Sequence, residues 1–378
     1  MEHVDNKKIM HYGGKKKVAF ITVHVGENFG SALQAIATYR ILNKFGVDPI
    51  LVNYIPPRVT VRGYFIRGFQ SVGSLIHMLL KFPCFIKNKG IFEGYIKAHC
   101  NITTPIYATD NFEDKCPKAD CYITGSDQVW NFFYNEGLDA HYFFNGIKGP
   151  KISYASSIGM ESLNDVESAN ISDLLRDYKY LSVREESARV ILKNIGFDNV
   201  PVLLDPTFML KMEEWASLAS KRIIQEKYLF VYMPYNTTDE EAHYHIIRKI
   251  ANERNIRVVS FSLTYLKDKR ADKTIFYPSP GDFVSLMIHA DFIVTNSFHG
   301  TAFSINLNKQ FVSIMPARFS NRVENILNMT GLSTKLIRGL NVEELNDDIM
   351  AYIDYIEVNR ILDSERQRAK DYLTASLK

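Results

Sequence analysis

The sequence predicts an α/β protein with two domains, each built around a parallel sheet. Short apolar runs alternate with segments of helical spacing along most of the chain. Polar turns follow several of these runs, as at the carboxyl ends of strands in open α/β sheets. The length of 378 residues is long for one domain and comfortable for two. Alternating strands and helices are typical of βαβ units, which build parallel sheets.

The first domain is expected over residues 17–208. Val18–Val23 reads as the first strand, and Ser31–Phe45 follows it with the apolar spacing of a helix. Gly46 suits the end of that helix, and Ile50–Val52 begins the next strand. Later strands are predicted at Cys121–Thr124, Ile152–Ala155, Tyr180–Val183 and Val202–Leu204, with helices at Ile171–Tyr178 and up to Asn194.

The second domain is expected over residues 209–340, and the boundary region is a helix around Met209–Glu226 that leads into the charged stretch Lys221–Lys227. The predicted strands are Tyr228–Met233, Val258–Phe261, a run from Phe292 and Phe311–Ile314; the helices are Glu240–Arg254, Phe283–His289, one from His299, and Asn321–Met329. Two further helices, Val342–Ile356 and Arg360–Leu373, fall within residues 341–378 and would pack back on the first domain. The expected fold is therefore two Rossmann-like domains with parallel sheets and an active site in the cleft between them.

An insertion at residues 56–92 differs from the rest. The wider segment 49–92 contains no Asp or Glu, and its apolar residues alternate with six basic ones: Arg58, Arg62, Arg67, Lys81, Lys87 and Lys89. One interpretation is a core helix with basic flanks. The other is a surface that faces an anionic membrane or a lipid-linked acceptor, because basic charge and apolar area add together in interfacial binding.

Composition excludes several classes of function. A net charge of +3 gives no argument for a nucleic-acid partner. The four cysteines lack paired C-x-x-C spacing, and no apolar leader or run of about 18 apolar residues occurs. We therefore expect free thiols and a cytoplasmic location, with at most peripheral membrane contact. The sequence also lacks metal-ligand spacing, so no catalytic metal and no cofactor are expected.

The segment Asp291–Ser304 contains the strongest candidate site. An apolar strand ends in Asn296 and Ser297, and His299 and Gly300 then open a helix. A histidine at a helix N-terminus can hold an anion and move a proton. The alternative for His299 is a buried histidine of the core. Gly300 would let a ligand approach the backbone.

Polar turns of the first domain supply further candidates. Arg184 ends a predicted strand and could bind a carboxylate or phosphate, or form an ion pair with Glu185 or Asp205. Asp127, beside Ser126, could take a proton from a hydroxyl or simply cap a helix. The Gly-containing turn with Asn28, Gly30 and Ser31 could bind an anion or a sugar hydroxyl, although it matches no dinucleotide or Walker motif. Arg318 and Arg322 begin a later helix and could reach the cleft or be solvated.

Taken together, these turns resemble the polysaccharide pyruvyl transferase family over roughly residues 17–337. The matching segments are Asn28–Gln34, Gly125–Asn131, Lys151–Ala155, Ser182–Glu186, Leu204–Thr207 and Ser297–Gly300. Many relatives have Arg where this chain has Ser297, so Arg322 or Arg318 is expected to replace it. The oligomeric state stays open.

The resemblance implies a fold similar to the two-domain GT-B glycosyltransferases. It also implies transfer of pyruvate from phosphoenolpyruvate to a sugar diol of a cell-surface polysaccharide or its lipid-linked precursor, giving a cyclic ketal and phosphate. His299 would be the acid, Asp127 a base, and Arg184 and Arg322 the clamp for the donor. Two alternatives are a glycosyltransferase that uses a nucleotide sugar and a carbohydrate-binding protein without catalysis.

Overall fold

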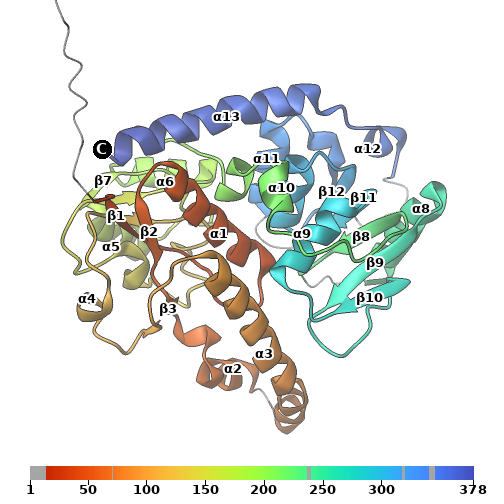
Figure 1. Ribbon diagram of the computed structural model, residues 1–378, viewed down its shortest axis with the longest axis horizontal. Coiled ribbons are helices and arrows are strands. Elements are labelled where there is room, and N and C mark those ends of the chain that lie inside the picture. The colour runs from red at the N-terminus through yellow and green to blue at the C-terminus, as the bar shows by residue number, and fades with distance from the viewer. Residues whose placement is uncertain (1–13, 70, 236–239, 317–319, 340–344) are drawn as a thin grey trace, which may run out of the picture.

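The computed structural model describes residues 14–69, 71–235, 240–316, 320–339 and 345–378. Two parallel sheets dominate it (Figure 1). The first has the order β2-β1-β5-β6-β7, and its strands are β1 Lys17–Ile21, β2 Asp48–Leu51, β5 Cys121–Thr124, β6 Lys151–Ser153 and β7 Tyr178–Tyr180. Every pairing between these strands is parallel. The predicted α/β class with parallel sheets is confirmed.

The second sheet has the order β10-β9-β8-β11-β12-β13 and is also parallel throughout. Its strands are β8 Tyr228–Tyr232, β9 Arg257–Ser262, β10 Lys273–Phe276, β11 Phe292–Thr295, β12 Phe311–Ile314 and β13 Leu336–Ile337. A separate short pair joins β3 Tyr54–Ile55 to β4 Ile106–Tyr107. In both main sheets the strand order reverses beside the first strand, which places a crevice at the carboxyl ends of the strands.

Helices connect the strands and cover the sheets (Figure 1). They are α1 Phe29–Lys44, α2 Val61–Gly68, α3 Val72–His99, α4 Phe112–Lys115, α5 Asp165–Leu175, α6 Glu186–Asn194, α7 Met212–Ala216, α8 Glu240–Arg254, α9 Pro280–His289, α10 Phe298–Asn306, α11 Ser320–Met329, α12 Asp347–Met350 and α13 Tyr355–Ser376. Short 3₁₀ turns lie at η1 Pro57–Val59, η2 Ala140–Phe143, η3 Pro206–Met209 and η4 Ser333–Lys335.

Several predicted elements need correction. Residues 202–204 do not form a strand, because Val202 makes only an isolated bridge to Val183. The strand predicted at 180–183 ends at Tyr180, where the chain turns toward the site. The helix predicted over 342–356 is wrong for its described part, which holds only the short α12 before α13 begins at Tyr355. Residues 340–344 lie outside the described part.

One apolar cluster joins the two sheets. Phe29, in the first turn of α1, stacks on Phe283 of α9 with ring centroids 5.0 Å apart. Its ring also contacts Phe92 of α3 and Phe261 and Tyr232 of the second sheet, so a helix of the first half meets rings of the second half here. All five rings belong to a single buried or half-buried cluster that continues through both halves of the chain. Burying aromatic rings is strongly stabilising, so this cluster holds the two halves in contact.

The C-terminal helix α13 also contacts both halves, and it runs along one side of the molecule past the two sheets (Figure 1). Arg366 donates to the backbone oxygen of Phe208 at 2.8 Å and to Oδ1 of Asn306, in α10, at 2.7 Å. Further along, Tyr372 donates to the backbone oxygen of Ser153 in β6 at 2.7 Å. The helix therefore bridges the two halves of the chain.

The insertion 56–92 forms η1, α2 and the first part of α3, and it extends away from both sheets (Figure 1). Only near its end, at Phe92, does α3 join the core. Its distal part carries exposed apolar side chains, among them Ile66, Phe69, Ile76, Leu79, Leu80 and Ile86. The interpretation as a core helix is therefore wrong for this distal part. Arg58 does not belong to the exposed basic set either, since it is buried against the ring of Tyr134.

Candidate functional site

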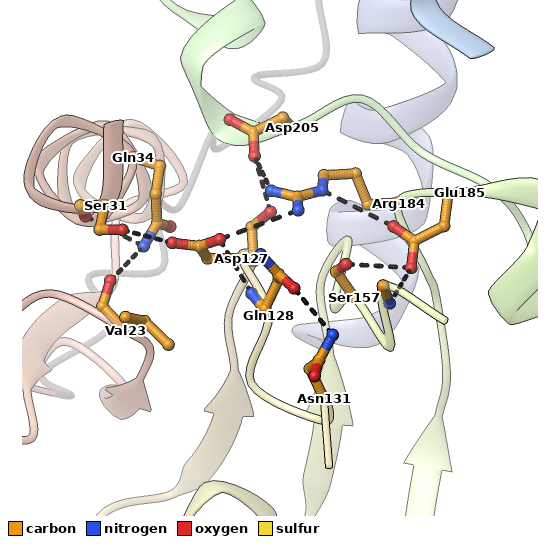
Figure 2. A network of polar contacts seen from close by, with 12 residues as sticks. Val23, Ser31, Gln34, Asp127, Gln128, Asn131, Ser157, Arg184, Glu185 and Asp205 are labelled. Carbon is orange, nitrogen blue, oxygen red and sulfur yellow. Dashed lines mark hydrogen bonds and ion pairs between the residues drawn. The ribbon is translucent and has the colours of Figure 1, made fainter. Parts of the chain in front are cut away.

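Asp127 is held in an unusual backbone conformation just past the end of β5. Its φ of +69° lies in the left-handed region, which costs a residue with a side chain roughly 1–3 kcal/mol. Residues in this conformation are often found at functional sites. It makes an isolated bridge to Ser156, so the alternative that it caps a helix is wrong. Its Oδ2 accepts a hydrogen bond from Ser31 Oγ at 2.5 Å, and its Oδ1 accepts from the Gln128 N–H at 2.9 Å. This network is drawn in Figure 2.

The first turn of α1 brings its own side chains to the same place. Asn28 is the N-cap, and its Oδ1 accepts the Ser31 N–H at 3.1 Å. Gln34, one turn further, donates to the backbone oxygen of Val23 at 2.9 Å (Figure 2). It also donates to Thr22 Oγ1 at 2.8 Å. Gln34 thereby fixes the start of α1 to the end of β1. Sequence reasoning gave it no role, although it closes the first segment of the family resemblance.

Arg184 is the buried cation of the site, with a side chain only 2% exposed. Its Nη1 donates to Asp205 Oδ2 at 3.0 Å. Two more carboxylates lie near, with Asp127 3.8 Å from Nη2 and Glu185 3.7 Å from Nε. Burial lowers the pKa of Arg184, but these three carboxylates outweigh burial and raise it. The ion pair weighed as an alternative is therefore present, while Nε and Nη2 have no hydrogen-bond partner among the described residues.

Asp205 organises this end of the first sheet. It accepts hydrogen bonds from Ser126 Oγ at 2.8 Å, from Arg184, and from the N–H and Oγ1 of Thr207 at 2.9 and 2.7 Å. Burial alone would raise the pKa of Asp205, but the charges of Arg184 and His299 and the bonds from Thr207 lower it. The Ser126 hydroxyl is thus engaged with Asp205. Asp205 followed by Pro206 at the start of η3 was the sequence signal for this carboxylate.

Glu185 positions the neighbouring loop. Its Oε1 accepts three hydrogen bonds, each 3.0 Å long, from Ser157 Oγ and from the N–H groups of Ile158 and Gly159. Figure 2 shows Glu185 on the opposite side of Arg184 from Asp127. It therefore holds the loop after β6 in place and adds negative charge beside Arg184.

His299 comes from the second sheet, in the first turn of α10. Its residue is 5% exposed, and its Nε2 has no hydrogen-bond partner among the described residues. Burial lowers the pKa of His299; Asp205 and Asp127 raise it in part, and Arg184 and Arg322 lower it further. The unpartnered Nε2 distinguishes it from a core histidine with satisfied nitrogens, such as His24, whose two ring nitrogens lie 3.0 and 3.1 Å from the oxygens of Thr22 and Asn53.

Gly30 provides the space in which His299 lies. A Cβ added at Gly30 would sit 2.1 Å from both Cγ and Nδ1 of the His299 ring. Gly300 has a different reason: its added Cβ would meet Thr295 Oγ1 at 2.1 Å and Tyr232 at 2.9 Å. The space beside Gly300 is therefore filled by protein. The close approach lies between α10 and α1, at Gly30.

Asn296 and Ser297 shape the turn between β11 and α10. Asn296 Nδ2 donates to the backbone oxygen of Tyr235 at 2.9 Å, which ties this turn to the end of β8. The Ser297 N–H donates to Thr295 Oγ1 at 3.1 Å, and its side chain makes no capping bond to the first turn of α10. The first N–H groups of α10 therefore keep their usual attraction for an anion.

Phe298 lines a cleft together with the site residues Arg184, Glu185 and Asp205. Its ring lies under two guanidinium groups, with Arg184 Cζ 4.6 Å and Arg322 Cζ 5.8 Å from the centroid. Arg322, in α11, is buried at 4% exposure. These three residues line the cleft, which has a volume of about 620 Å³ and lies between α6, residues 199–205, α11 and α13. Arg318 lies outside the described residues, so only Arg322 can be placed as a substitute for the arginine absent at position 297.

Metal sites, membrane-spanning helices and the cysteines remain to be described. Within the described ranges, no group of three or more His, Cys, Asp or Glu residues could hold a metal ion. No helix in the described part of the chain is long and apolar enough to span a bilayer. The four cysteines are unpaired and buried, and burial raises the pKa of both Cys100 and Cys116 to about 12.

Comparison with known proteins places this arrangement. A model of the polysaccharide pyruvyl transferase family matches residues 28–317 of the chain. No curated protein is significantly similar to it in sequence. Among solved structures, the UDP-GlcNAc 2-epimerase from Neisseria meningitidis bound to UDP-GlcNAc shows 12% identity and a TM-score of 0.51, covering 96% of this chain and 99% of that one. Another UDP-N-acetylglucosamine 2-epimerase shows 12% identity, a TM-score of 0.52 and coverage of 96% and 97%. At such identity the likeness concerns the fold alone, which is of the GT-B type.

Proposed function

We propose that this chain, which belongs to the polysaccharide pyruvyl transferase family, transfers pyruvate from phosphoenolpyruvate to two hydroxyls of a glycan acceptor. The observation that carries the proposal is the buried, unpartnered Nε2 of His299, in the first turn of a helix and electrostatically coupled to Arg184 and Arg322. A proton donor beside two cations suits a small dianionic enol substrate.

The donor has two anionic ends, and the site offers a place for each. The uncapped first turn of α10, together with Arg322, suits the phosphate. Arg184 suits the carboxylate, because its Nε and Nη2 lack hydrogen-bond partners while Nη1 is fixed by Asp205. An arginine held at one nitrogen is pre-organised for a second, bidentate partner.

The chemistry then needs three proton movements. His299 donates a proton to the methylene carbon of the donor, which becomes a methyl group and leaves C2 electrophilic. The first acceptor hydroxyl attacks C2 and gives its proton to Asp127, whose Oδ2 is held by Ser31. The C2–O bond to phosphate breaks, the second hydroxyl attacks C2, and its proton leaves with the phosphate. The products are a cyclic ketal and inorganic phosphate. None of these proposed steps uses a cofactor or a metal.

The donor itself prepares His299 for this role. In the empty site burial keeps the pKa of His299 below its usual range, so the neutral ring predominates at neutral pH. Bound phosphoenolpyruvate places a carboxylate and a phosphate beside the ring, and nearby negative charge raises the pKa of a histidine. Bound donor therefore shifts His299 toward the protonated form that the proposed reaction needs.

The acceptor in this proposal is a cell-surface polysaccharide or its lipid-linked precursor, modified by a cytoplasmic enzyme that contacts the membrane peripherally. Support comes from the distal parts of α2 and α3, which carry exposed Ile66, Phe69, Leu79 and Leu80. The segment around them, residues 49–92, has no acidic residue and has five basic ones besides the buried Arg58. Apolar side chains with basic neighbours are typical of a surface that binds anionic lipid.

The decisive assay measures phosphate release from phosphoenolpyruvate, with and without a panel of soluble and lipid-linked galactosides and mannosides. Release that depends on an acceptor supports pyruvyl transfer. In parallel, a thermal-shift experiment compares phosphoenolpyruvate with nucleotide sugars. Stabilisation by a nucleotide sugar, with no effect of phosphoenolpyruvate, would replace this proposal by glycosyl transfer.

Membrane contact has its own assay, sedimentation with vesicles that contain phosphatidylserine. Each basic residue near an anionic surface is worth about 1 kcal/mol, so Lys81→Gln with Lys87→Gln should weaken binding by about thirtyfold. The matched control changes the same charge elsewhere, in exposed Lys267→Gln with Lys269→Gln. Equal vesicle binding by the two double variants would refute membrane contact through α2 and α3.

A further inference from the structure

A second groove opens in the first half of the molecule, away from the cleft lined by Arg184. It has a volume of about 570 Å³ and lies between the turn after β1, the short helix η1 and the loop after β5. Its lining residues are Val25, Gly26, Glu27, Asn28, Arg58, Val59, Phe133, Tyr134 and Glu136.

The groove adjoins the catalytic network. Asn28, one of its lining residues, accepts the N–H of Ser31, and the Ser31 hydroxyl donates to Asp127. On the other side, one loop carries both Asp127 and the aromatic wall formed by Phe133 and Tyr134. The groove and the carboxylate that we propose as the base are therefore neighbours, connected through Asn28 and Ser31 and through this loop.

The loop that forms this wall is held rigidly. Asn131 donates to Gln128 Oε1 at 2.8 Å and accepts the Tyr134 N–H at 2.6 Å. Asn135 donates to the backbone oxygen of Val129 at 3.0 Å. Trp130 and Phe132 anchor the loop in the core, whereas Phe133 is 63% exposed. An exposed aromatic ring on a rigid loop gives a binding surface at little cost in conformational entropy.

Charge decides which ligand fits. Among the lining residues that the structure describes, Arg58 is the one cation, and its Nη1 already donates to the Tyr134 backbone oxygen and to Asn135 Oδ1, both at 3.2 Å. Glu27 and Glu136 add two carboxylates to the lining. An anion such as phosphoenolpyruvate is disfavoured there, while carboxylates and an amide are good partners for hydroxyls. An aromatic face with a few polar groups is also the usual composition of a site for an amphipathic small molecule.

We infer that this groove binds an uncharged pyranose unit of the glycan acceptor, with its apolar face on Phe133 and its hydroxyls toward Glu27, Asn28 and Glu136. This assignment rests on the proposed function, because it is the reaction at Asp127 that requires an acceptor at this place. It separates the two substrates by charge: the anionic donor binds beside Arg184 and α10, and the neutral sugar binds in the groove.

The test uses saturation-transfer NMR on the full chain, with methyl glycosides of galactose, mannose, glucose and N-acetylglucosamine as probes. At least one glycoside should receive saturation from the wild type, and Phe133→Ala should weaken its binding by about tenfold. Phe276→Ala, which removes a half-exposed ring from β10, is the matched control and should bind like the wild type.

Two results would overturn the inference: no glycoside binds the wild type, or Phe133→Ala binds as well as the control. Thermal stabilisation by phosphoenolpyruvate, measured on the same samples, keeps this failure separate from failure of the proposed function. If phosphoenolpyruvate stabilises the wild type and Phe133→Ala equally while no glycoside binds, the donor site survives and the groove assignment falls. If phosphoenolpyruvate has no effect on the wild type, the proposed function falls.

Discussion

Replacing Gly30 by Ala tests whether α1 positions His299 for catalysis. The added Cβ would lie 2.1 Å from Cγ and Nδ1 of the ring, whereas ordinary contacts between such atoms measure 3.4–4 Å. The ring, or the first turn of α1, must therefore move by more than 1 Å. A displacement of about 1 Å in a catalytic group costs about a hundredfold in rate, or about 2.7 kcal/mol of transition-state stabilisation. We expect kcat for pyruvyl transfer to fall by about that factor in Gly30→Ala.

The assay is acceptor-dependent phosphate release, with circular dichroism to confirm folding. Gly90→Ala is the control, because its Cβ meets nothing within 4 Å and lies inside α3, where Ala favours the helix. A double-mutant cycle with His299→Ala identifies the route of the effect. If Gly30 acts through the histidine, Gly30→Ala adds little to a variant that already lacks it. Fully additive losses, or normal turnover in Gly30→Ala, would refute the reasoning.

Three further predictions follow from the same geometry. His299→Ala should lower turnover by about 10²–10⁴-fold, and near-normal turnover would exclude it as the acid. Burial lowers the pKa of His299 in the empty site, and bound donor should raise that pKa, so phosphoenolpyruvate should bind with proton uptake near neutral pH. Calorimetry in buffers of different ionisation enthalpy measures the proton uptake. The same uptake in His299→Ala would contradict the prediction. Arg184→Ala should raise the KM for phosphoenolpyruvate and destabilise the fold by about 3–5 kcal/mol, since it leaves buried Asp205 without its cation. Arg184→Lys should keep most of the stability but should also raise the KM. An unchanged KM in both variants would exclude Arg184 as a binding residue for the donor.

The sequence predicted the sheets well because their strands are apolar runs separated by helices of clear periodicity. The prediction from sequence was wrong where tertiary contacts decide whether a segment forms a strand. Val202 and Val183 look like strand residues, yet each makes only single bridges, because the chain there turns to bring Arg184 and Asp205 into the site. Edge strands as short as β13 have too few residues to show a pattern.

For the site, local motifs identified the residues but not their partners. Asp127, Arg184 and His299 each follow a strand, and that was visible in the sequence. The reason for Gly30 was not visible, because it depends on a ring that arrives from residue 299 in the other half of the chain. The sequence offered Asp205 as an ion-pair partner of Arg184, but it gave no sign of the hydrogen bond to Asp205 from Ser126 in the turn after β5.

The position of His299 makes the reaction depend on contact between the two halves. Its backbone belongs to α10, but its ring lies against Gly30 of α1, and its charged neighbours Arg184, Asp127 and Asp205 come from the first half. If the halves separated, the histidine would leave those carboxylates, and Phe298 would leave the guanidinium of Arg184. The cluster around Phe29 opposes such a separation, because opening would expose several buried rings to water. The proposed proton donor, cation and base are therefore already together in the structure, so binding energy need not be used to close the site.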